Sequence, residues 1–138
     1  MKLLIVTLVL FTSTLTQAQT HSDLLGGWKL TQFLIGSTPF CKGAYGKLIY
    51  EKTGYVSVAI NCPGIVTTQD PAFDYHGSLF YSGRFHLQGS AIIHRISNSN
   101  VPNLIGKNVA RTIESLSTHA LVLTGNLGDK SLRIEWKR

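Results

Sequence analysis

Short runs of alternating apolar and polar residues recur from residue 28 to the C-terminus. A period of two is typical of half-buried β-strands, and no stretch of useful length in this part of the chain has the 3.6-residue period of a helix. Gly, Asn, Asp, Ser and Pro separate the runs, as expected for turns. Eight strands are predicted: Trp28 to Ile35, Lys47 to Tyr50, Tyr55 to Ile60, Leu79 to Gln88, Ala91 to Ser97, Lys107 to Ser115, His119 to Thr124, and Leu132 to Lys137. The pattern predicts an all-β chain folded as a single eight-stranded antiparallel barrel, a size that can enclose one small ligand.

The alternation also predicts which side chains face inward. In the fourth predicted strand Tyr81 and Phe85 share a face with Leu79 and Leu87, and the opposite face is polar. His94 and Arg111 both stand on faces that are otherwise apolar. An inward arginine is costly unless its guanidinium is bonded, because its charge is effectively permanent. We expect its acceptor to be a ligand carboxylate, a backbone carbonyl, Glu114 shifted by a bulge, or ordered water.

The pairing of the second and third predicted strands as a hairpin indicates whether the two cysteines come close enough to form a disulfide. Residues 51–54 form the predicted turn, so that Tyr50 faces Tyr55, and Cys41 and Cys62 come within two positions of facing each other. A bulge or a frayed end would bring their Cα atoms within the roughly 4.4–6.8 Å that a disulfide requires. We therefore predict a Cys41–Cys62 disulfide.

The N-terminus has the features of a signal peptide that is removed on export. Met1 and Lys2 precede an apolar run from Leu3 to Phe11, and small residues at 16–18 suit cleavage after Ala18. The run is too short to span a bilayer, so no stable membrane insertion is expected. Residues 1–18 are thus predicted to be a signal peptide and 19–138 the mature domain, exported to the periplasm or secreted. Loss of Lys2 would lower the formal net charge from +6 to +5.

The basic excess does not indicate a nucleic-acid partner, because the cations are scattered and only Lys137 and Arg138 are adjacent. Four histidines of the mature chain, at positions 76, 86, 94 and 119, do not share a face by alternation. The cysteines lack the spacing of a zinc site. No metal and no cofactor are predicted, and the identity of any protein partner cannot be inferred from the sequence.

Four segments taken together resemble the lipocalin-like domain family of small bacterial and fungal proteins. They are Leu25 to Leu30, which contains a Gly-x-Trp signature, Gly46 to Tyr50 followed by Thr53 to Ser57, Tyr81 to Phe85, and His94 with Pro102, Gly106 and Arg111. The resemblance implies a lipocalin-like barrel with an internal cavity and no established reaction. It also implies that Trp28 plugs one end of the barrel, beneath a basic residue that is Arg133, Lys137 or Arg138. A signal peptide and a disulfide depart from the family's usual pattern.

The default function is therefore the binding of a small hydrophobic or amphipathic molecule inside the barrel. The predicted ligand-binding residues supply aromatic area and a few polar groups: Tyr50, Tyr55, Tyr81, Phe85, His94 and Arg111. Two alternatives stay open. One is a barrel enzyme of isomerase or cyclase type, with His94 as base, Tyr81 as acid and Arg111 stabilising an enolate or carboxylate. The other is an exported protein-binding or inhibitor module that uses the outer surface.

Overall fold

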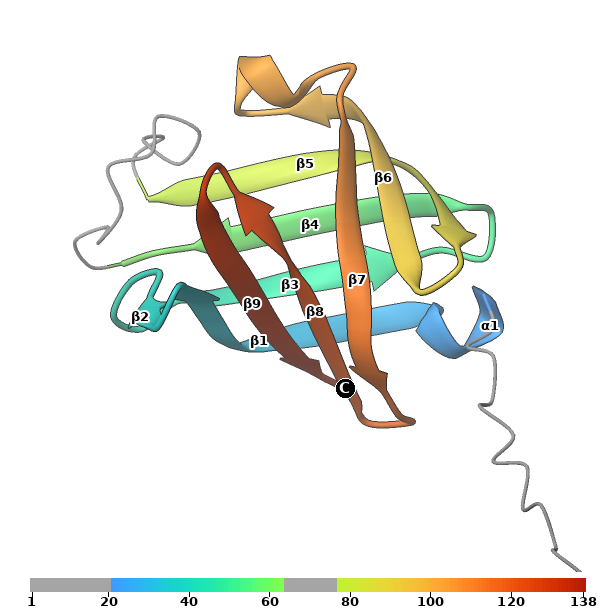
Figure 1. The fold of residues 1–138 in the computed structure, drawn as a ribbon. Helices are drawn as coiled ribbons and strands as arrows, with labels where there is room; N and C mark the ends of the chain where they lie inside the picture. Colours follow the sequence, from blue (N-terminus) through green and yellow to red (C-terminus); the bar gives the residue numbers. More distant parts are fainter. Residues whose placement is uncertain (1–20, 64–76) are drawn as a thin grey trace, which may run out of the picture.

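The computed structural model describes residues 21–63 and 77–138, and the predicted signal peptide lies outside these ranges. The described residues form nine strands and a short N-terminal helix (Figure 1). The elements are α1 (His21–Leu24), β1 (Gly26–Ile35), β2 (Thr38–Pro39), β3 (Tyr45–Tyr50), β4 (Tyr55–Asn61), β5 (Ser78–Gln88), β6 (Ala91–Ser99), a 3₁₀ turn (Pro102–Leu104), β7 (Asn108–Leu116), β8 (Ala120–Leu127) and β9 (Lys130–Lys137).

Eight of these strands form a closed antiparallel barrel. Each strand from β3 to β9 pairs with the next, and β1 closes the ring by pairing with both β3 and β9. The two-residue β2 is an extra strand folded back on the end of β1. The predicted fold class and all eight predicted strands are confirmed. The main difference at the ends is that β8 continues to Leu127, three residues beyond the predicted Thr124.

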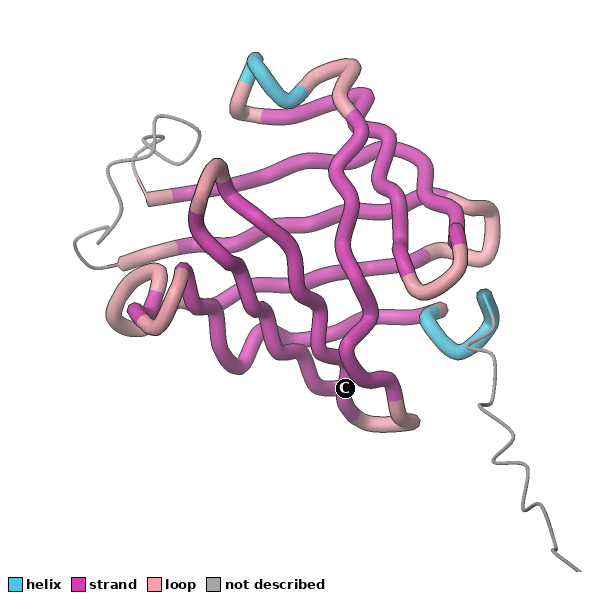
Figure 2. The backbone as a smooth tube through the Cα atoms, in the orientation of Figure 1, coloured by secondary structure: helices cyan, strands magenta, loops and turns pink. Residues whose placement is uncertain are grey.

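β1 belongs to both sides of the barrel. Residues 26–29 pair with β3, and residues 29–35 pair with β9 across an irregularity between Leu30 and Gln32. Bulges of this kind bend a strand and increase its twist. As a result β3, β4 and β5 run across the back of the view in Figure 2, while β7, β8 and β9 cross in front of them. The apolar side chains of both layers meet between them and form the core.

Trp28 fills one end of the barrel. Its side chain is 1% exposed, and its indole Nε1–H donates to the carbonyl of Leu24 in α1 at 2.9 Å. Of the three basic residues that the family resemblance left open, Arg138 covers the indole, with its Cζ atom 3.9 Å from the ring centroid. The same guanidinium donates to the carbonyls of Thr118, Leu25 and Asp23 at 2.7–2.8 Å. These bonds tie the C-terminus to the segment before β1.

The predicted Cys41–Cys62 disulfide is present, with the two Cα atoms 5.9 Å apart. It joins the segment after β2 to the end of β4, so it lies at the open end of the β3–β4 hairpin. Both cysteines are buried.

The register of that hairpin differs by one residue from the prediction. Tyr50 pairs with Val56, and Glu51 donates its N–H to the carbonyl of Tyr55 at 2.8 Å. The connection is therefore a three-residue loop that ends in Gly54 with a positive φ of 87°, rather than a four-residue turn. A slip of one residue moves a side chain to the other face of the sheet. Tyr50 consequently points into the barrel and Tyr55 points out of it.

No helix in the described part of the chain is long and apolar enough to span a membrane.

Candidate functional site

A chain of hydrogen bonds links three side chains inside the barrel. The hydroxyl of Tyr50 on β3 lies 2.9 Å from Nε2 of His94 on β6, and the hydroxyl of Tyr81 on β5 lies 3.0 Å from Nδ1 of the same ring. All three residues are buried. Gly83 lets the backbones of β5 and β6 lie close together, because a Cβ there would stand 1.9 Å from the carbonyl oxygen of Arg95 on β6.

Burial sets the charge state of this group. Burial, and secondarily the positive charge of Arg111, lower the pKa of His94 from its ordinary 6.5 to about 3. Burial also raises the pKa of Tyr50 and the pKa of Tyr81 above the ordinary value of 10.0, and the charge of Arg111 opposes both shifts. At neutral pH the imidazole and both phenols are therefore uncharged.

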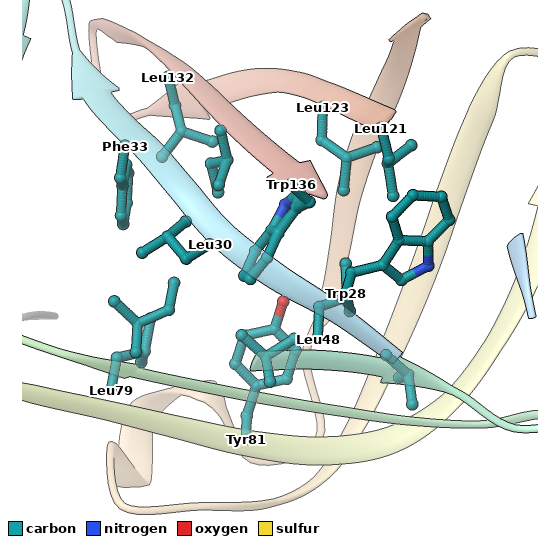
Figure 3. Packing of buried hydrophobic residues seen from close by; sticks show 14 of the residues in the cluster. Trp28, Leu30, Phe33, Leu48, Leu79, Tyr81, Leu121, Leu123, Leu132 and Trp136 are labelled. Carbon is teal, nitrogen blue, oxygen red and sulfur yellow. The ribbon is translucent and has the colours of Figure 1, made fainter. Parts of the chain in front are cut away.

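A neutral imidazole has one N–H donor and one acceptor nitrogen, so the two tyrosines must have different roles. The tyrosine at the acceptor nitrogen donates its O–H, whereas the tyrosine at the N–H accepts and retains an O–H to donate elsewhere. Tyr81 lines two cavities, an inner one of about 20 Å³ and an outer one of about 460 Å³, and Tyr50 lines neither of them. A buried donor without an acceptor costs about 1–3 kcal/mol. The favoured arrangement is Tyr50 O–H to Nε2 and Nδ1–H to the Tyr81 oxygen, which leaves the Tyr81 O–H for the cavity. Figure 3 shows this hydroxyl pointing into the barrel.

Arg111 lies on the inner face of β7 and lines both cavities, as its alternation predicts. Its Nη1 donates to the carbonyl of Ala110 at 2.9 Å. Within residues 21–63 and 77–138 the ion pairs join Arg133 to Glu114 and to Glu135, and none involves Arg111. Of the four acceptors expected for Arg111, the structure provides a backbone carbonyl for part of the guanidinium. Glu114 pairs with Arg133 instead.

β7 and β8 separate next to Arg111. Residues 112–116 of β7 pair with residues 121–124 of β8, but residues 108–111 pair with β6 and residues 125–127 pair with β9. Figure 1 shows the two strands diverging toward the upper part of the view. Gly125 stands at the point of separation, and a Cβ there would lie 3.3 Å from the Arg111 guanidinium. The glycine thus leaves room for the arginine between the strands.

Two cavities meet at this position. The inner one has a volume of about 20 Å³, room for about one water molecule. The outer one has a volume of about 460 Å³ and lies against the separated parts of β7 and β8, within the size range of small-molecule sites. Leu79, Tyr81 and Arg111 line both. Leu104, Val109 and Leu127 add apolar surface to the outer cavity.

The six predicted ligand-binding residues divide into three groups. Tyr81, His94 and Arg111 line a cavity together. Tyr50 and Phe85 are buried but line neither cavity. The Tyr50 hydroxyl is hydrogen-bonded to His94, and Phe85 stacks on His21 and packs at a tilt against Tyr50, with the ring centroids 4.7 Å apart in each pair.

The inward orientation predicted for Tyr55 is wrong. Tyr55 is 48% exposed on the outer face, where the Arg84 guanidinium lies 4.6 Å from its ring centroid. The cause is the one-residue register difference of the β3–β4 hairpin.

Trp136 is a cavity residue that the sequence did not single out. It lines the inner cavity from β9 and is 2% exposed. Its indole Nε1–H is buried and has no hydrogen-bond acceptor within the described residues. Trp136 lies on the buried face of β9 with Leu132 and Ile134, and nothing in the sequence indicated that its N–H would lack an acceptor.

The fold and site define a class: a small up-and-down barrel with one end filled by a tryptophan and an arginine, and with an internal cavity near the other end. The model of the lipocalin-like domain family matches residues 25–137. The chain therefore belongs to the lipocalin-like domain family, and the predicted resemblance is confirmed.

Two solved structures are similar to the chain. A lipocalin-like protein from Bacteroides uniformis ATCC 8492 is 17% identical, with a TM-score of 0.51, over 84% of this chain and 98% of that chain. At this identity it supports the fold alone. The Cpx pathway activator NlpE from Escherichia coli is 13% identical, with a TM-score of 0.40, over 69% of this chain and 42% of that one. No match was found among curated proteins.

Proposed function

We propose that this protein is an exported binding protein that holds a small hydrophobic or amphipathic molecule in its outer cavity. The observation that carries the proposal is a cavity of about 460 Å³ whose lining combines aliphatic side chains with Tyr81, Arg111 and the polar residues Asn108, Thr112 and Asn126. A mostly apolar pocket with a few convergent polar groups is the usual form of a small-molecule site.

Export is supported by two features that come from different parts of the chain. Residues 1–18 have the pattern of a signal peptide, and Cys41 is joined to Cys62. Disulfides persist in oxidising compartments such as the periplasm and the extracellular space. The proposed mature domain is 19–138. Intact-mass measurement of the exported protein should give a chain that begins at Gln19 and carries one disulfide, whereas a chain that retains residues 1–18 would contradict the proposal.

The enzyme alternative gains no support from the site. A general base works best when its pKa lies near the operating pH, and the pKa of His94 is about 3. Both of its ring nitrogens are also engaged by tyrosines. His94 is better suited to orienting Tyr81 than to accepting a proton from a substrate.

Binding can be tested with N-phenyl-1-naphthylamine, a neutral apolar fluorophore whose emission rises out of water. We expect one molecule to bind per chain and to quench the emission of Trp136, which lines the inner cavity. Val109→Phe places a larger side chain on the inner wall of the outer cavity and should weaken binding at least about tenfold.

Ile93→Phe is the matched control. Ile93 pairs with Ala110 on the neighbouring strand and with the exposed His86, so it lies on the outer face of β6. This variant should bind the fluorophore as the natural chain does. Equal binding by both variants, or no binding by the natural chain, would contradict the cavity proposal.

A further inference from the structure

Three side chains that line the two cavities, those of Arg111, Trp136 and Tyr81, carry N–H or O–H donors that the described residues leave unbonded. The guanidinium of Arg111 has five N–H donors, of which Nη1 is bonded to the carbonyl of Ala110. The indole N–H of Trp136 has no acceptor within the described residues. The Tyr81 O–H is left over once His94 is neutral and donates to the Tyr81 oxygen.

No carboxylate lines either cavity in the described part of the chain, and Arg111 is the only cation that does. Half-buried positive charge without an anionic partner is unfavourable, and an arginine fork matches the two oxygens of a carboxylate in a bidentate arrangement. Among the described residues, the local charge balance is thus one positive charge with no carboxylate beside it.

From this arrangement we propose that the ligand carries a single carboxylate, which binds between the Arg111 guanidinium and the Tyr81 hydroxyl where the two cavities meet. The inference rests on the proposed binding function. The apolar part of the ligand then occupies the outer cavity against Leu79, Leu104 and Val109 and leaves through the opening between β7 and β8.

The charge balance favours a carboxylate over a phosphate monoester. A carboxylate carries one negative charge, which the single charge of Arg111 neutralises, whereas a phosphate monoester carries about −1.5 to −2 at pH 7. Gly125 contributes to the proposed carboxylate site, since a side chain at this position would enter the space of the Arg111 guanidinium.

The test uses decanoate, decyl phosphate and decan-1-ol as competitors of N-phenyl-1-naphthylamine at pH 7. For the natural chain, decanoate should displace the fluorophore at the lowest concentration. Arg111→Gln should lower the affinity for decanoate about 10- to 100-fold, which is the effect expected when a hydrogen bond between charged groups is lost. Decan-1-ol and the fluorophore carry no charge, so the same variant should weaken the binding of each of them less than it weakens the binding of decanoate.

Further variants separate loss of the charge from loss of the fold. Arg111→Lys keeps the charge but not the planar fork, so its decanoate affinity should lie between those of the natural chain and Arg111→Gln. Tyr81→Phe should weaken decanoate about 3- to 10-fold. Arg84→Gln, on the outer face over Tyr55, is the control and should change nothing.

The outcomes distinguish the two proposals. If the fluorophore does not bind the natural chain, the binding function fails. If the fluorophore binds but decanoate is no better than decan-1-ol, or Arg111→Gln and Arg111→Lys leave decanoate unaffected, the carboxylate inference is overturned while the cavity proposal stands. If decyl phosphate binds more tightly than decanoate, the assignment of a carboxylate is overturned in favour of a more highly charged group.

Discussion

Two arginines lie near opposite ends of β8, and their surroundings are opposite in kind. Arg138 stacks on Trp28 and donates to three backbone carbonyls, which are those of Thr118, Leu25 and Asp23. Arg111 lies beside the residues of β8 that leave β7, and the structure shows one bond from it, to the carbonyl of the preceding residue. The guanidinium of Arg138 is thus bonded within the fold, whereas most N–H donors of Arg111 have no acceptor among the described residues. This difference separates the structural end of the barrel from the proposed binding end.

The largest difference is expected in stability. Arg138→Gln should lower the free energy of unfolding by about 1–3 kcal/mol, because it removes a cation–π contact and three hydrogen bonds from a charged donor. Arg111→Gln should leave it within about 0.5 kcal/mol of the natural value or raise it, since the lost bond is local and a poorly compensated charge disappears. Urea unfolding followed by circular dichroism measures both variants. Equal losses would show that Arg111 is as structural as Arg138.

The hydrogen-bonded chain beside Arg111 should also make stability depend on pH. Because the pKa of His94 is about 3 in the folded protein and about 6.5 when unfolded, the unfolded chain binds a proton first as pH falls. Stability is therefore fully present above about pH 6.5 and is lost as pH falls toward about 3, with a slope of up to about 1.4 kcal/mol per pH unit from this group.

Two variants isolate that slope from the titration of the carboxylates. His94→Gln should flatten the dependence of unfolding free energy on pH between about 6.5 and 3, whereas His86→Gln, on the exposed outer face of β5, should leave it unchanged. If the slope of His94→Gln equals that of the natural chain, His94 does not lose its proton on folding and the account of the buried neutral imidazole is wrong.

The smallest expected effect concerns cations outside the barrel. Lys29 on β1 lies directly opposite Lys47 on β3 and Lys137 on β9, and all three are exposed. Like charges facing each other across strands are mildly unfavourable. Lys29→Glu should raise the free energy of unfolding by about 0.2–1 kcal/mol, and the gain should shrink in 1 M NaCl. A loss of stability in Lys29→Glu would show that Lys29 makes stabilising contacts that outweigh its repulsion of the other two lysines.

The alternation of side chains was enough to predict the barrel and the core of the site. Tyr81, His94 and Arg111 were predicted to face inward together, and the structure places all three on the same cavity wall. The disulfide also followed from strand pairing, because a hairpin brings residues far apart in sequence to one end. These features depend on the period of two, which a single sequence contains.

Other features depend on register and on gaps between strands, which the period does not fix. Tyr55 was misplaced because a three-residue loop replaced a four-residue turn, and a one-residue slip reverses a side chain. Residues 125–127 were predicted as loop, although they continue β8 and form one side of the opening. The partner of Trp28 stayed open among three cations, because only the position of the C-terminus in space selects Arg138.

The two tryptophans offer the most direct test of a filled end and a binding end. Trp28 donates its indole N–H to Leu24, whereas the indole N–H of Trp136 has no acceptor within the described residues and the Trp136 side chain lines the inner cavity. Since the chain has two tryptophans, a ¹H–¹⁵N NMR spectrum contains two indole signals. On titration with N-phenyl-1-naphthylamine, the signal of Trp136 should shift to saturation at one equivalent while that of Trp28 stays in place. A shift of Trp28 alone, or no shift of either signal, would contradict the assignment of the cavity beside Arg111 as the binding site.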